Sequence, residues 1–126
     1  KNFMIVDAAM TELVRPTLYG AHHDIGLVRH RDEKLLTWDV VGPVCESGDF
    51  LGLARELPEL DPGALLAVFS AGAYGAVLGS SYNTRPAAPE VLVDGATHDV
   101  VRRRPSYADM LAGEKIPDWL NSKDGQ

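Results

Sequence analysis

The chain has 126 residues, 45% of them hydrophobic and 24% charged, a composition typical of a single globular domain with a modest core. With 18 acidic and 12 basic residues its net charge is −6, so we expect no nucleic-acid partner, because a general nucleic-acid binder is basic. No apolar run approaches the roughly 18 residues of a membrane-spanning helix, so we expect no membrane partner either.

The single cysteine and the first residues bear on the setting of the protein. One cysteine cannot form a disulfide within the chain, which suits a reducing compartment, and we expect a cytoplasmic location. The chain begins at Lys1 rather than at a methionine, and the apolar run 3–6 is too short for a signal peptide. A domain seldom begins on the first residue of a core strand, so we expect this chain to be a piece of a longer protein.

Apolar runs separated by turn residues predict a mainly β structure. The first half of the chain contains three strand candidates, a short helical turn that Gly20 closes, a charged connection and one ambiguous run. The strand candidates are residues 3–9, 24–30 and 36–44, and the helical turn is 16–19, with Arg15 just outside it. The charged connection is 31–34, and the ambiguous run is 54–60. Pro16 suits the first turn of a helix.

The second half continues the β pattern. Residues 61–63 predict a turn, and the continuous apolar run 64–71 predicts a strand buried on both faces. Residues 91–94 and 98–104 are a predicted strand pair around Gly95. Ser106, with Asp109 three residues on, is a predicted cap of a short helix that ends at Gly113. Turn signals every eight to twelve residues are typical of a β-barrel or sandwich.

Cys45 and Glu46 are the most informative residues, because they stand at the foot of an apolar strand, before a Ser-Gly-Asp turn. A lone cysteine is commonly a small buried hydrophobic residue. At an exposed turn, however, a thiol can donate a proton, since an ordinary thiol is mostly protonated near neutral pH. Glu46 is either a solvated turn carboxylate or a group that binds a substrate ammonium. Both residues can serve one site only if the backbone turns there.

Three further residues carry candidate binding groups. Arg15 and Tyr19 lie four residues apart and would share one face of a helical turn. They are either a surface pair or a guanidinium and a phenol that bind a carboxylate. Tyr74 is flanked by small residues that let a ligand approach the backbone closely. The alternative is a core tyrosine at the end of a strand.

Two other clusters, one of histidines and one of arginines, are interpreted as structural and not as binding sites. His22, His23 and Asp24 invite a metal site, but no further ligands are spaced to complete one. We therefore expect no metal. The arginines 102–104 could bind phosphate, but a solvated strand edge accounts for them better.

Five segments together resemble the C-terminal part of the diaminopimelate decarboxylases, pyridoxal-phosphate enzymes of the alanine-racemase fold type. They follow one another in the family's order and spacing over nearly the whole chain, at 3–10, 15–19, 42–49, 71–75 and 81–95. The run from Cys45 to Asp49 is the most specific. Ornithine decarboxylases usually carry an aspartate after the cysteine, so Glu46 favours the diaminopimelate branch.

The resemblance implies that residues 1–120 are the C-terminal β domain of such an enzyme, a β-barrel or sandwich with short helices, and that 121–126 are a polar tail. In the family, an N-terminal (β/α)8 barrel supplies the lysine that forms a Schiff base with pyridoxal 5′-phosphate. No lysine of this chain matches that motif. The family's active site lies between the barrel of one subunit and the β domain of its partner in a homodimer.

The resemblance also implies a role for each candidate residue. Cys45 would be the proton donor, reaching across the dimer interface, and Glu46 would bind the ammonium at the distal, L-configured end of meso-diaminopimelate. Arg15 and Tyr19 would hold the distal carboxylate, and Tyr74 would lie against cofactor and substrate. The product would be L-lysine, with release of CO2.

The sequence departs from the family pattern at two places away from these residues. Ala9 stands where glycine is common, and residues 87–89 lack a common arginine. Two alternatives stay open, namely a stand-alone β module that binds a small ligand or partner, and a domain of an ornithine- or arginine-type decarboxylase. On the main interpretation the chain alone is inactive, and the apolar surface that faces the barrel drives association.

Overall fold

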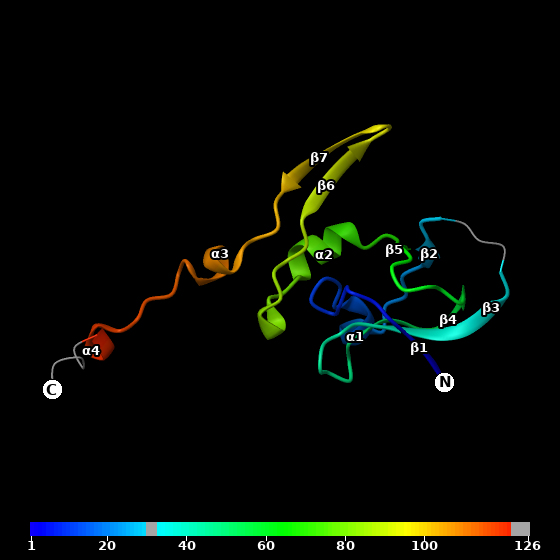
Figure 1. Cartoon of the computed structure of the whole chain (residues 1–126), viewed down its shortest axis with the longest axis horizontal. Coiled ribbons are helices and arrows are strands. Elements are labelled where there is room, and N and C mark those ends of the chain that lie inside the picture. Colours follow the sequence, from blue (N-terminus) through cyan, green and yellow to red (C-terminus); the bar gives the residue numbers. More distant parts are fainter. Residues whose placement is uncertain (30–32, 122–126) are drawn as a thin grey trace. The chain divides into compact units, whose positions relative to one another are not determined.

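The structure, a computed structural model, describes residues 1–29 and 33–121 (Figure 1). The chain divides into two units, Lys1–Ala87 and Ala88–Gln126. Each unit contains strands and short helices, so the predicted mainly β fold is confirmed. Within the described residues, no helix is long and apolar enough to cross a membrane.

The first unit is built on a three-stranded sheet of order β1-β3-β4 (Figure 1). Strand β1 (Asn2–Ile5) lies parallel to β3 (Leu35–Val41), and β3 lies antiparallel to β4 (Phe50–Pro58). A second pair joins β2 (Ile25–Leu27) to β5 (Leu66–Val68). The parallel β1–β3 pair brings the start of the chain beside the strand that leads to Cys45.

A bulge in the β3–β4 pair is stabilised by the buried carboxylate of Asp39. The register shifts between Trp38 and Val40, and Ala54 opposite has a φ of 52°. The Ala54 amide donates to Asp39 at 2.9 Å, and the Lys1 ammonium lies 2.5 Å from the same side chain. The hydrogen bond from Lys1 and then that from Ala54 lower the pKa of Asp39 below its ordinary range.

The core of the first unit is small and apolar. Partly buried apolar side chains from β1, β2, β3 and β5 pack against four buried ones, Leu13, Val40, Leu51 and Leu57. The indole of Trp38 also donates to the Leu57 carbonyl at 3.0 Å, which ties β3 to β4. This core fixes β3 and β4, the two strands that the Cys45 turn connects.

Three short helical segments complete the first unit. They are α1 (Arg15–Tyr19), α2 (Gly72–Leu78) and the 3-10 turn η1 (Tyr82–Thr84). The predicted end of α1 at Gly20 is confirmed, since Gly20 has a φ of 62° and caps the helix. Arg15 lies inside the first turn rather than outside it, because Pro16 is accepted at the second helical position.

The second unit consists of a hairpin and two short helices. Strand β6 (Glu90–Asp94) pairs antiparallel with β7 (Thr97–Arg102) around Gly95, as the sequence predicts. Helix α3 (Tyr107–Leu111) begins with the predicted capping box of Ser106 and Asp109, and α4 spans Asp118–Asn121. Arg103 binds Asp109 with two hydrogen bonds of 2.6 and 2.7 Å.

Several predicted elements differ from the structure. The first strand ends at Ile5, because residues 7–12 form a hydrogen-bonded loop. The ambiguous run 54–60 belongs to β4 up to Pro58. The prediction that 64–71 is buried on both faces is wrong. Strand β5 has three residues and, among the residues described, pairs only with β2, and its neighbours Leu65 and Phe69 are 65% and 52% exposed.

Tyr74 also differs from its structural alternative, because it lies in α2 and is 47% exposed rather than sitting at the end of a core strand. Helix α3 ends at Leu111, two residues before the predicted Gly113. The end of the predicted strand at His30, the first two residues of the connection 31–34 and the tail from 122 lie outside the described residues.

Candidate active site

Cys45 and Glu46 lie in the turn between β3 and β4 and are both exposed. The backbone reverses there, because the Glu46 amide donates to the Val44 carbonyl at 2.8 Å and the Asp49 amide donates to the Glu46 carbonyl at 3.0 Å. The predicted turn is therefore confirmed, and the thiol is not sealed in the core. Both functional groups are accessible to a ligand or to another polypeptide.

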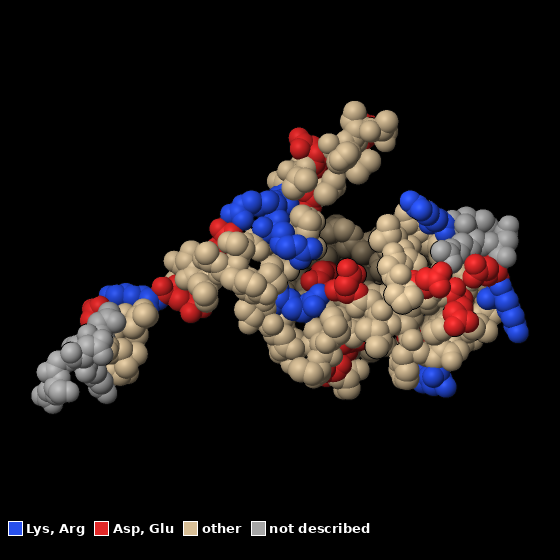
Figure 2. Space-filling view, in the orientation of Figure 1, with Lys and Arg blue, Asp and Glu red and all other residues tan. Residues whose placement is uncertain are grey.

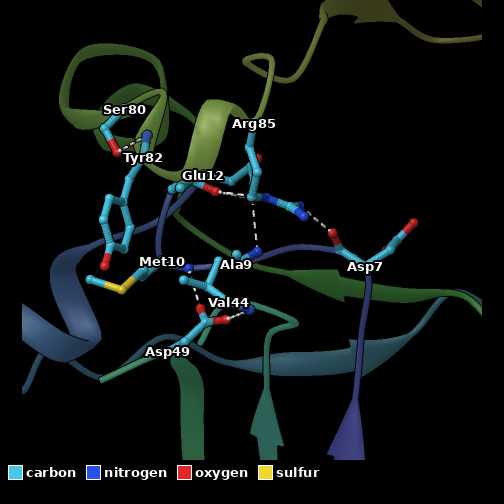
Figure 3. Close-up of polar contacts among 10 residues, drawn as sticks. Asp7, Ala9, Met10, Glu12, Val44, Asp49, Ser80, Tyr82 and Arg85 are labelled. Carbon is cyan, nitrogen blue, oxygen red and sulfur yellow. Dashed lines mark hydrogen bonds and ion pairs between the residues drawn. The ribbon is translucent and has the colours of Figure 1, made fainter. Parts of the chain in front are cut away.

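The buried carboxylate of Asp49 holds this turn in place (Figure 3). Its Oδ2 accepts from the Val44 amide at 2.6 Å, and its Oδ1 accepts from the Met10 amide at 2.7 Å. A Cβ at position 42 would lie only 2.3 Å from Oδ2, so Gly42 gives the carboxylate its space. The geometry of the Cys45 turn thus depends on a side chain that sequence reasoning did not select.

The carboxylate of Glu46 folds back onto its own turn. Its Oε1 accepts from the Ser47 hydroxyl and from the Gly48 amide, both at 3.2 Å. Within the described residues its second oxygen, Oε2, has no such partner. This arrangement orients the carboxylate, while one oxygen stays available to an ammonium group.

Arg15 and Tyr74, two of the predicted binding residues, are in direct contact. The Arg15 guanidinium lies 3.9 Å from the centre of the Tyr74 ring. Such a cation–π contact is worth about 0.5–2 kcal/mol and holds the guanidinium plane in one orientation. The structure thus joins residues of α1 and α2 that are far apart in the sequence.

The buried side chain of His23 supports Arg15 from behind. His23 Nδ1 lies 3.1 Å from the Phe69 carbonyl, and its Nε2 lies 3.4 Å from Arg15 Nη1. A carbonyl only accepts and a guanidinium only donates, so Nδ1 carries the proton and Nε2 accepts. His23 therefore links Phe69, which follows β5, to Arg15.

Tyr19 is the least constrained candidate. It lies at the end of α1 and is 65% exposed, and within the described residues its hydroxyl has no hydrogen-bond partner. The helix itself is tied to the Cys45 turn, because the Thr17 hydroxyl donates to the Gly48 carbonyl. Among the residues described, no side-chain hydrogen bond joins Tyr19 to Arg15, Cys45 or Glu46.

The loop 7–12 is the common base of these segments (Figure 3). The Met10 amide of this loop donates to Asp49. The side chain of Arg85 binds the same loop, because its Nη2 donates to the Asp7 carbonyl at 2.6 Å and its Nε donates to Thr11 Oγ1 at 3.2 Å. Arg85 also lies 3.6 Å from the Glu12 carboxylate. The segment 80–85 is thereby held against the same loop as the Cys45 turn.

The segment 80–85 also contacts the cysteine, since Asn83 Nδ2 lies 3.5 Å from Cys45 Sγ, within hydrogen-bond range for sulfur.

The first unit contains an open cavity of about 640 Å³ between β1, β2 and residues 59–66. None of the predicted site residues lines this cavity. The exposed turn, and not the cavity, is therefore the candidate active site.

The histidine pair has partners other than a metal. His22 Nε2 lies 3.1 Å from Asp24 Oδ1, and His22 Nδ1 lies 2.6 Å from Arg55 Nη1, whereas His23 is engaged as described above. Across residues 1–29 and 33–121, no three acidic, histidine or cysteine side chains form a group that could hold a metal ion.

Sequence reasoning missed three residues of this region, namely Asp49, His23 as a partner of Arg15, and Asn83. Asp49 ends the Ser-Gly-Asp run, and aspartates in turns commonly accept backbone hydrogen bonds, so a local signal existed. His23 and Asn83 act on side chains 8 and 38 residues away in the sequence. No local pattern predicts such distant contacts.

Residues 1–72 match the family described as "Pyridoxal-dependent decarboxylase, C-terminal sheet domain". A diaminopimelate decarboxylase of Archaeoglobus fulgidus is 47% identical over 121 residues, 95% of this chain and 29% of its own length. One of Pseudomonas fluorescens is 55% identical over 116 residues, 92% of this chain and 28% of its own length.

Solved structures agree with these relatives. The crystal structure of diaminopimelate decarboxylase from M. jannaschii in complex with L-lysine has a TM-score of 0.86 and 34% identity, and the match covers 94% of this chain and 27% of that one. The chain therefore belongs to the C-terminal sheet domains of the pyridoxal-dependent decarboxylases. It spans less than a third of the length of the relatives it matches.

Proposed function

We propose that this chain is the C-terminal β domain of a diaminopimelate decarboxylase, which converts meso-2,6-diaminopimelate to L-lysine and CO2. The observation that carries the proposal is the exposed Cys45–Glu46 turn, held by Asp49, in a chain 47–55% identical to enzymes of that name. The turn offers a proton donor and a carboxylate side by side, which suits a substrate that needs a proton at one end and carries an ammonium at the other.

The side chains take the following roles in this proposal. Cys45 Sγ–H gives its proton to the substrate carbon from which CO2 has departed, and the resulting thiolate is later reprotonated from solvent. Glu46 binds the distal ammonium of the substrate through Oε2. Arg15, with Tyr19, binds the distal carboxylate by charge-assisted hydrogen bonds.

Tyr74 supports the assignment of pyridoxal 5′-phosphate as the cofactor. Arg15 packs on its ring, the side chain is 47% exposed, and within the described residues its hydroxyl has no hydrogen-bond partner. An exposed, oriented phenol of this kind fits contact with an aromatic cofactor held mainly by another domain. When bound, the cofactor accepts the electron pair that the departing carboxylate leaves behind.

The remaining parts of the proposal concern partners. Residues 1–120 act as the β domain, with 121–126 as a tail, and an N-terminal barrel supplies the cofactor lysine. A second subunit of a homodimer completes the site, which is why the candidate residues lie on an open surface instead of in a closed cavity. The location is cytoplasmic, in keeping with the single thiol.

The test is turnover by the full-length protein that carries this chain. We expect it to release CO2 from meso-diaminopimelate and to form L-lysine, with far lower kcat/KM for ornithine and arginine. The 126-residue chain alone should be inactive and should show no absorbance band from added pyridoxal phosphate. Preference for ornithine or arginine would support the related-decarboxylase alternative, and absence of any turnover would favour the stand-alone binding module.

A further inference from the structure

Asn83 occupies a backbone conformation that a side chain seldom adopts. Its φ and ψ are 55° and 28°, in the left-handed region, and Thr84 follows with a φ of 57°. Two consecutive non-glycine residues with positive φ cost free energy, and such strain persists only where the surroundings impose it. Asparagine tolerates this region better than most residues, but glycine adopts it without cost.

Contacts on both sides of Asn83 impose this conformation. On the N-terminal side, the Ser80 amide donates to the Thr11 carbonyl at 3.0 Å. On the C-terminal side, Arg85 is fixed to the loop 7–12 by its hydrogen bonds and by Glu12 (Figure 3). The chain between these anchors has to turn sharply, and the turn presents the Asn83 side chain.

The sulfur that receives this side chain is anchored to the same loop. Asp49 connects the Cys45 turn to Met10, as shown above. The donor Nδ2 and the acceptor Sγ are therefore held by one framework, and their 3.5 Å separation does not depend on flexible ends. The amide of Asn83 can only donate through this nitrogen, so the sulfur is the acceptor.

We infer that Asn83 is a positioning residue for Cys45. Its amide orients the thiol before proton transfer and donates a hydrogen bond to the thiolate that proton transfer leaves. A hydrogen bond to the charged form of a group favours that form. The inference rests on the proposed function for its catalytic consequence, but the Asn83–Cys45 hydrogen bond itself can be tested without turnover.

The experiment compares Asn83→Gly and Asn83→Asp with the wild type in the full-length protein. Glycine accepts the positive φ and aspartate tolerates it, so both retain the turn, but neither offers an N–H to the sulfur. Thr84→Gly is the matched control, because it relieves the neighbouring strained residue and leaves the amide of Asn83 in place. Thermal unfolding verifies that all three variants are folded.

The first readout is the rate at which iodoacetamide alkylates Cys45 at one fixed pH near neutrality, followed on the Cys45 peptide by mass spectrometry. The thiolate is the reactive form. We expect both Asn83 variants to react about 3- to 10-fold more slowly than the wild type, as for the loss of one hydrogen bond, and Thr84→Gly to react at the wild-type rate.

The second readout is the split between kcat and KM for meso-diaminopimelate. We expect kcat to fall by about 3- to 10-fold in both Asn83 variants, with little change in KM. Wild-type values for Asn83→Gly in both readouts would show that Asn83 serves only the backbone and would overturn the inference. An inactive wild type would instead defeat the proposed function and leave the alkylation rates to decide on Asn83.

Discussion

The two units of the chain differ in how they bury their side chains. The first unit, Lys1–Ala87, has a core around Leu13, Val40, Leu51 and Leu57 and contains buried polar groups that hold loops in place. In the second unit, none of residues 88–120 is buried, and the hairpin β6–β7 exposes apolar side chains such as Leu92 and Val93, at 66% and 64%. Large areas without charged side chains are visible in Figure 2.

The two units therefore have different roles. Every candidate site residue lies in the first unit, where internal hydrogen bonds fix the Cys45 turn, so this geometry is encoded within residues 1–87. The second unit has a regular hairpin and a capped helix but no core of its own among the residues described. Exposed apolar side chains of this kind are typical of an interaction surface.

The largest effect is expected at the proton donor of the first unit. In the full-length protein, Cys45→Ala should lower kcat by about 10²- to 10⁴-fold, the usual contribution of a general acid. KM should change little, because the thiol does not hold the substrate. Steady-state kinetics with meso-diaminopimelate measure both, and a loss confined to KM would remove the proton-donor role.

The next effect concerns stability of the same unit. Asp49→Ala removes the acceptor for the Val44 and Met10 amides, and each buried donor left without a partner costs about 1–3 kcal/mol. Asp49→Asn keeps one oxygen and should cost less. Urea unfolding measures the change. The control is Asp24→Ala at a side chain that is 84% exposed, and an equal effect of both alanine variants would show that Asp49 does not hold the turn.

For the second unit we predict a change in self-association instead of a change in folding stability. Val91 pairs with Val100, and Val93, two residues on, shares that face of the hairpin. Replacing Val91 and Val93 by threonine keeps the β-branched shape. It should weaken self-association of the 126-residue chain by at least tenfold, since burial of a valine contributes about 1.5–3 kcal/mol. Light scattering over a concentration series would measure this. Unchanged association would mean that the hairpin is not the interacting surface.

The smallest effect is a local pH dependence in the second unit. The Arg103 guanidinium, and then Ser106, hold the pKa of Asp109 well below its ordinary range. A lowered pKa in the folded state means that the stabilisation is complete above the unfolded value of about 3.9 and is lost as pH falls through the folded value. Hydrogen exchange of the α3 amides should therefore accelerate below about pH 4 in the wild type. In Asp109→Asn the exchange rate should not show this acceleration. The same acceleration in both proteins would contradict the assignment.

Sequence reasoning succeeded where a local signal determines structure. Gly20 ends α1, Gly95 centres the hairpin, and Ser106 caps α3, because each of these depends on neighbouring residues. Exposure of the Cys45 turn was also predictable from the Ser-Gly-Asp run. The family resemblance supplied the candidate roles, which composition and spacing alone could not.

It failed where partners are distant in the sequence. The contact of Arg15 with Tyr74 spans two helices, and that of Cys45 with Asn83 depends on how Arg85 is anchored. The burial of residues 64–71 was overestimated, because an apolar run reveals hydrophobicity but not how many strands flank it. The pairing of strands and the path of the loop 7–12 are properties of the whole first unit.

The most direct test of the central claim is protection of Cys45 by a ligand. In the full-length protein with pyridoxal phosphate bound, iodoacetamide should alkylate Cys45 at least about tenfold more slowly when L-lysine or meso-diaminopimelate saturates the site, because the ligand covers the turn. Glutamate at the same concentration should give no such protection. Alkylation of Cys45 at one rate with and without these diamino acids would show that the turn does not face the substrate.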